Sequence, residues 1–164
     1  MSYLIKPVVI VVLSAICMWV IRGYGAYMKK RRLESRELLR LSEAIRKSVA
    51  TRLQTPKEAL SRISCRSGAA EGFRRLVASG KTLYEAFSET EGSFSLSRGC
   101  REMLSEYFAS FGKGYLDEEI RCADEFIERY RAEVEREELA GEADERVARS
   151  IAIAVTLGII ILII

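Results

Sequence analysis

The chain has 164 residues, enough for one domain, and carries 26 basic and 23 acidic residues but no histidine. Without histidine it lacks the side chain best suited to acid–base catalysis near neutrality, which is also the commonest metal ligand. The four cysteines form no C-x-x-C pair, so we interpret them as small buried packing residues. We therefore expect no catalytic residues, no cofactor, no metal and no small-molecule substrate.

The charges are divided unevenly along the chain. Residues 29–75 contain 14 basic and 5 acidic residues, a net +9, whereas residues 76–149 contain 10 basic and 18 acidic residues, a net −8. Such asymmetry is typical of a nucleic-acid or partner-binding face. Alternatively, the two poles meet inside one bundle and largely cancel, which is the interpretation we favour.

Two uncharged segments lie near the ends of the sequence. One runs for 15 residues between Lys6 and Arg22, and the other for 15 residues after Arg149. Each covers only ~22 Å as a helix, against a hydrocarbon core of ~30 Å, so flanking residues must extend it. Their Ile, Leu and Val content favours insertion by about 3–6 kcal/mol. We expect anchors at 1–28 and 150–164, around a central domain at 29–149.

Positive charges predict the orientation of these anchors. The basic cluster Met28–Arg32 follows the first segment, which favours an uncleaved anchor with this flank in the cytoplasm over a cleaved signal peptide. Arg146 and Arg149 keep the flank of the second segment on the same side. We expect a two-pass protein of the cell membrane, with a cytoplasmic central domain and both termini outside.

The central domain reads as a series of helices. In the first, from Lys30 to Leu53, apolar residues recur at three- and four-residue spacing. A second helix begins where Thr55 acts as the cap, Pro56 takes the first position and Glu58 completes a capping box. A third helix extends over residues 70–77.

The triplet Gly80-Lys81-Thr82 raises the question of a phosphate-binding loop. A P-loop needs another glycine five residues before Gly80 and a preceding strand, but that position is Arg75 and the preceding pattern is helical. Helix termination explains the same residues: Gly80 ends one helix, and Thr82 caps the next with Glu85 as its partner. We therefore expect no nucleotide site here.

The remaining elements complete an all-α fold. A fourth helix starts at Leu83, residues 89–95 form a polar loop, and a fifth helix runs from Leu96 to Phe111. The last helix starts near Asp117 and continues into the C-terminal anchor. Since no stretch alternates with a period of two, we predict a small antiparallel bundle of about six helices, flanked by two transmembrane helices, and no sheet.

These features in this order resemble the stage III sporulation protein AB family. The matching residues are Thr55-Pro56 with Glu58-Ala59-Leu60, the stretch Gly80–Ala86, and Phe111-Gly112-Lys113. The stretch Gly80–Ala86 is also similar to a turn in the cytoplasmic domains of the type II secretion F-type platform proteins. The chain departs from the family pattern after Gly112, because Gly114 and Tyr115 stand where an acidic residue is usual.

The resemblance implies a non-enzymatic membrane scaffold in the channel complex that links mother cell and forespore. Its implied partners are a secretion-type ATPase and sibling membrane subunits of that complex. The sequence leaves open whether the chain also forms a homo-oligomer. Exposed charges are the candidate contact residues. On the basic side they are Arg31, Arg32, Arg36, Arg40 and Lys47, and on the acidic side Glu118, Glu119, Asp124, Glu125 and Glu128.

An alternative function belongs to a different class. The basic half could make the chain a membrane-tethered regulatory module that binds anionic lipid or nucleic acid. No aromatic residues interleave with the basic residues between Arg31 and Gly72, so a base-stacking platform is not evident and the sequence argues against nucleic acid.

Overall fold

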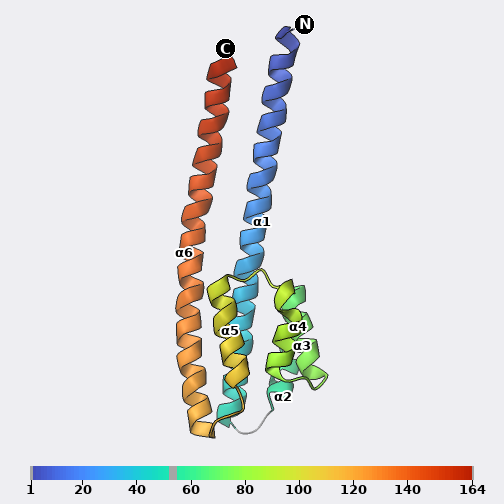
Figure 1. The fold of residues 1–164 in the computed structure, drawn as a ribbon, viewed down its shortest axis with the longest axis vertical. Helices are drawn as coiled ribbons and strands as arrows, with labels where there is room; N and C mark the ends of the chain where they lie inside the picture. Colours follow the sequence, from blue (N-terminus) through green and yellow to red (C-terminus); the bar gives the residue numbers. More distant parts are fainter. Residues whose placement is uncertain (1, 52–54, 164) are drawn as a thin grey trace. The chain divides into compact units, whose positions relative to one another are not determined.

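The computed structural model describes residues 2–51 and 55–163, and their regular elements are all helical (Figure 1). The side chains of residues 2–10, 13, 14, 17, 149, 156 and 159–163 also lie outside the described set. The elements are α1 (Ser2–Thr51), α2 (Pro56–Ser61), α3 (Gly68–Ala78), α4 (Leu83–Thr90), the short 3-10 turn η1 (Glu91–Ser93), α5 (Arg98–Ser110) and α6 (Leu116–Ile163). The prediction of an all-α fold with about six helices is confirmed.

The chain is divided into two units. One unit, the terminal helix pair, combines Met1–Lys29 with Glu137–Ile164, and the other, the helical domain, comprises Lys30–Arg136. Each of the two long helices therefore contributes residues to both units.

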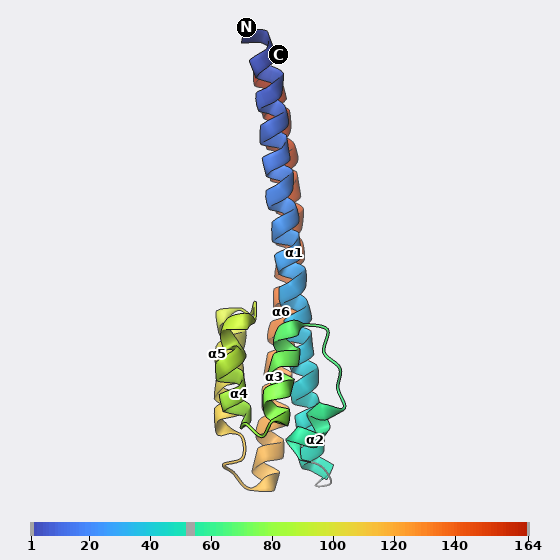
Figure 2. The same cartoon turned by 90° about the vertical axis from the view of Figure 1, so that its right-hand side faces the viewer.

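Two surface ion pairs join the two long helices in the helical domain. Arg46 on α1 donates two hydrogen bonds to the Asp124 carboxylate on α6, of 2.7 and 2.8 Å, and Arg131 donates to Glu43 at 2.6 Å. The short helices pack in succession, α2 on α3, α3 on α4, and α4 on α5 (Figure 2). Because the residue numbers of the paired groups run in opposite directions, α1 and α6 are antiparallel in this domain.

Aromatic rings form the centre of the core. The predicted apolar residues of α1, Leu38, Leu41 and Ile45, are fully buried against it. Phe108 on α5 packs on both Phe73 of α3 and Phe87 of α4, with ring centroids 5.3 and 5.4 Å apart. The core thus joins four helices that are distant in sequence. The face predicted for α1 ended at Leu53, which lies outside the described residues.

The predicted helix boundaries at residues 55 and 80–85 are confirmed. Thr55 with Glu58, and Thr82 with Glu85, each form a capping box in which side chain and backbone bond reciprocally. Gly80 has a φ of 103°, and the Gly80 and Lys81 amides donate to the carbonyls of Val77 and Leu76. This hydrogen-bond pattern is a Schellman helix end, so the glycine-lysine-threonine triplet is a turn between α3 and α4.

Two sequence predictions about local structure are wrong. Residues 89–95 are not simply a polar loop, because α4 extends to Thr90 and Phe94 is buried in a stacked contact with Phe87 at 6.0 Å. The fifth helix begins later than predicted, at Arg98, because the Ser97 hydroxyl caps it by accepting from the Cys100 amide. The cysteines also differ from the prediction. Cys100 is buried but Cys65 is half-buried and Cys122 exposed, while the Cys17 side chain lies outside the described set.

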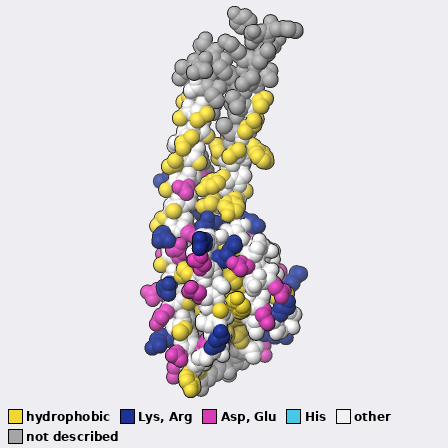
Figure 3. Space-filling model, viewed as in Figure 1, with side chains coloured by type: hydrophobic (Ala, Val, Ile, Leu, Met, Phe, Trp, Pro, Cys, Tyr) yellow, Lys and Arg dark blue, Asp and Glu magenta, His cyan; other side chains and the backbone are white. Residues whose placement is uncertain are grey.

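The terminal helix pair has an apolar surface. Trp19 is 78% exposed and Leu139 is 71% exposed, and ten further Val, Ile, Leu and Met side chains of this unit are also exposed. Figure 3 shows apolar side chains over the described part of this unit and charges of both signs over the helical domain. Among the described side chains, no helix has an apolar stretch long enough to cross a membrane. Both predicted anchors, 1–28 and 150–164, include residues whose side chains are not in the described set.

Candidate docking surfaces

Two buried carboxylates on α1 fix the loops that lead into α3 and α5. Glu34 is fully buried and Glu37 is 4% exposed. Glu37 accepts hydrogen bonds from the backbone amides of Arg66 and Ser67, and Glu34 accepts from the Ser67 hydroxyl at 3.0 Å and from the Ser95 amide at 2.6 Å. Buried backbone donors need such acceptors, so these two side chains attach both loops to α1.

These two carboxylates were not predicted from the sequence, although the sequence contains a signal for them. Glu34 lies four residues before Leu38, and Glu37 lies four residues before Leu41, so both fall on the buried stripe of the helix. Acidic residues in register with an apolar stripe indicate a buried hydrogen-bonding role. The hydrogen bonds of these two side chains therefore hold the loops before α3 and α5 against α1.

The predicted basic residues divide into two groups. Arg36, Arg40 and Lys47 are exposed on α1, and their spacing of four and seven residues places them on one side of the helix. Arg31 and Arg32 are partly buried at the beginning of the domain. The structure therefore brings only the first three together as an exposed basic face of α1.

The predicted acidic residues are also divided. Asp124 is engaged with Arg46, which holds the pKa of the Asp124 carboxyl below its usual range. Glu119 accepts from the amides of Gly112 and Gly114, both at 2.9 Å, so it stabilises the turn between α5 and α6. The exposed acidic side chains that these contacts do not involve are Glu118, Glu125 and Glu128.

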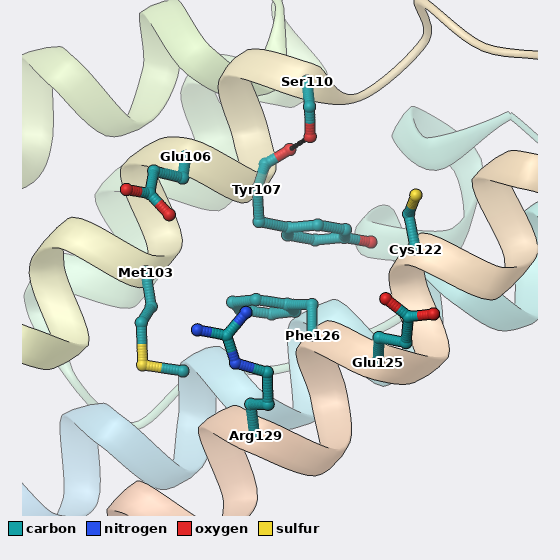
Figure 4. A pocket seen from close by; sticks show the side chains of 8 residues that line it. All are labelled: Met103, Glu106, Tyr107, Ser110, Cys122, Glu125, Phe126 and Arg129. Atoms are coloured by element: carbon teal, nitrogen blue, oxygen red, sulfur yellow. Dashed lines mark hydrogen bonds between the residues drawn. The ribbon is translucent and has the colours of Figure 1, made fainter.

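A groove between α5 and α6 adds a surface that the charge pattern did not reveal. Its volume is about 280 Å³. The lining residues are Met103, Glu106, Tyr107 and Ser110 from α5, and Cys122, Glu125, Phe126 and Arg129 from α6 (Figure 4). The rings of Tyr107 and Phe126 lie parallel, with centroids 4.1 Å apart and an interplanar angle of 4°, and they lie between Glu106 and Glu125 in Figure 4.

Tyr107 is the unusual member of this groove. Its side chain is 6% exposed, and among the described residues its hydroxyl has no hydrogen-bond partner. Burial raises the pKa of the phenol well above its usual value, and the negative charges of Glu119 and Asp124 raise it further. The hydroxyl therefore stays protonated throughout the physiological range.

Among the described residues, no three His, Cys, Asp or Glu side chains come together in a way that could hold a metal ion. Lys81, the lysine of the glycine-lysine-threonine triplet, forms an ion pair with Glu89. The helical domain has three surface features: an exposed basic face on α1, exposed carboxylates on α6 and the α5–α6 groove.

The family model of stage III sporulation protein AB matches residues 6–164, which is nearly the whole sequence. No curated protein and no solved structure matches the chain.

Proposed function

The chain belongs to the stage III sporulation protein AB family and is thus a sporulation protein, and we propose that it acts as a non-enzymatic membrane scaffold. In this proposal the terminal helix pair anchors the chain in the mother-cell membrane as a two-pass protein. The helical domain, on the cytoplasmic side, docks a secretion-type ATPase and sibling subunits of a channel complex between mother cell and forespore.

The contrast between the two units carries the proposal. Exposed apolar patches of this extent are rare on soluble monomers and mark surfaces that another phase or partner covers. Between the described side chains of α1 and α6 in this unit there is also an apolar groove of about 370 Å³. It is lined by Ile16, Val20, Ile21, Ala148, Ile151, Ala152 and Val155. Lipid or neighbouring apolar helices would cover both features.

The helical domain has the opposite character. Its exposed basic face on α1 and the exposed carboxylates of α6 suit partners with complementary charge, and such charges mainly set specificity and association rate. Attachment of both ends to a membrane would hold the domain at a fixed height. A restricted orientation lowers the entropy that is lost when a partner docks.

Cysteine labelling in intact sporulating cells tests the topology. Cys122 is exposed and serves as the reporter of the helical domain, whereas the buried Cys100 is unsuitable. A membrane-impermeant maleimide should label a Ser2→Cys variant in intact cells, but should label Cys122 only after permeabilisation. A Cys122→Ser variant identifies the signal from that residue. Labelling of Cys122 from outside would contradict the proposal.

Charge reversal tests the docking role. Arg36→Glu with Arg40→Glu should reduce the amount of ATPase that co-purifies with the full-length chain, because both residues belong to the exposed basic face. Lys57→Glu with Arg62→Glu reverses the same number of charges at exposed positions in α2 and at its end, so it is the matched control and should leave that amount unchanged. Loss of binding to anionic vesicles, with ATPase binding intact, would instead support the lipid-binding alternative.

A further inference from the structure

The geometry points to the α5–α6 groove as the docking site of an amphipathic helical segment, rich in Lys and Arg, from a partner protein. This inference rests on the proposed scaffold role in one respect, namely that the occupant is a protein. It concerns a surface different from the exposed basic face of α1, and it predicts the opposite charge on the partner.

The groove is large enough to take an apolar side chain of a partner, since its volume is about 280 Å³. An apolar anchor from a helix that lies along α5 and α6 needs no more space than this. Helix-in-groove recognition uses such anchors at three- and four-residue spacing.

The floor of the groove is apolar and well fixed. The stacked rings of Tyr107 and Phe126 are continued by Tyr130, whose ring lies 5.4 Å from that of Phe126, so the floor is part of the core. Met103 borders the floor, and its flexible thioether adapts to the shape of an incoming side chain. A preformed floor lowers the ordering cost of binding.

The walls determine the charge of the occupant. Glu106 on α5 forms no ion pair among the described residues, and Glu125 on α6 has only a 4.0 Å contact with Arg121. Arg129 is the one cation in the lining, so the lining has a net charge of −1. Arg129 lies one helical turn beyond Glu125. We therefore expect basic residues of the segment near Glu106 and Glu125, and a polar or acidic residue near Arg129.

A designed peptide tests the inference on the full-length chain in lipid nanodiscs. The probe is a fluorescent helical peptide of about 18 residues, with Leu and Phe on one face and Lys and Arg flanking that face. A second peptide has Glu in place of every Lys and Arg. The basic peptide should bind and should slow alkylation of Cys122, which is exposed and lines the groove. The acidic peptide should do neither.

Matched variants locate the binding site. Glu106→Lys with Glu125→Lys should raise the Kd of the basic peptide about tenfold, since two attractive contacts become repulsive. Glu118→Lys with Glu128→Lys makes the same change of net charge at exposed positions outside the groove, and should raise the Kd less than about threefold. The comparison separates a local contact from a general effect of charge.

Four outcomes would overturn the inference: no binding of the basic peptide, no protection of Cys122, equal binding of both peptides, or equal loss in the two double variants. Protection of Cys122 on concentrating the protein without peptide would overturn it as well, because a second copy of the chain would then be the occupant. The topology and ATPase experiments are separate measurements, so the scaffold proposal can fail while the groove still binds the peptide.

Discussion

Replacing Glu37 with alanine is expected to lower the free energy of unfolding of the helical domain by about 2–4 kcal/mol. The substitution removes the acceptor of the Arg66 and Ser67 amides. Hydrogen bonds to a charged group contribute about 1.5–3 kcal/mol each, which gives an upper range of about 3–6 kcal/mol. The Arg66 amide is only partly buried and regains water in the variant, so the expected loss is smaller than this sum.

Glu43→Ala is the matched control, since it makes the same substitution in the same helix. Glu43 forms an ion pair with Arg131, but both side chains are substantially exposed. Surface ion pairs contribute about 0–1 kcal/mol, so this variant should be nearly as stable as the original chain.

Chemical denaturation of the full-length chain and hydrogen exchange provide the measurements. In the Glu37→Ala variant the amides of Arg66 and Ser67 should lose protection first, because their acceptor is gone. If Glu37→Ala destabilises the chain by no more than about 0.5 kcal/mol beyond Glu43→Ala, the structural role assigned to the buried carboxylate is refuted.

The remaining predictions concern a turn, the groove and a surface ion pair. Gly80→Ala should cost about 1–2 kcal/mol in denaturation, because an L-residue is strained at a φ of 103°, and an unchanged midpoint would contradict this. Tyr107→Phe should stabilise the chain by about 1 kcal/mol at neutral pH, since it removes a buried hydroxyl without a described partner. Because the pKa of Tyr107 is raised in the folded state, stability should also fall above about pH 10, where the unfolded phenol ionises, and the phenylalanine variant should lose part of that dependence. The pKa of Glu71 should be about 2 by NMR titration, because the guanidinium groups of Arg74 and Arg75 donate hydrogen bonds to its carboxylate. The stability that these bonds contribute is fully present above the pKa of Glu71 in the unfolded chain, and it is lost as the pH falls through about 2. Arg74→Gln should raise that pKa, and an unchanged value would contradict the assigned cause.

Local structure could be predicted where neighbouring residues decide it. The capping boxes at Thr55 and Thr82 and the helix end at Gly80 depend on residues within a few positions of one another. The sequence alone was therefore sufficient to predict them. The start of α5 was predicted wrongly. Leu96 fits the apolar spacing of the helix, but it lies in the preceding loop and is buried there. The helix begins only after Ser97, whose side chain caps it.

The candidate site was less accessible to prediction. Charge counting identified exposed residues such as Arg36, Arg40 and Glu128, but it also selected Asp124 and Glu119, which are engaged by Arg46 and by the turn at Gly112. The pairing of Asp124 depends on which helix lies opposite, and that of Glu119 on the shape of the turn before α6; spacing within one helix carries neither kind of information.

By itself the sequence determined that the chain is helical, where α2 and α4 begin and α3 ends, and that its ends are apolar while its middle is charged. These properties follow from hydrophobic periodicity, capping residues and composition, all of which are local. Only the tertiary structure decided that Glu34 and Glu37 are buried, that Tyr107 stacks on Phe126, and that α5 and α6 enclose a groove. Each of these features joins groups that are far apart in the chain, and such contacts depend on how the helices pack.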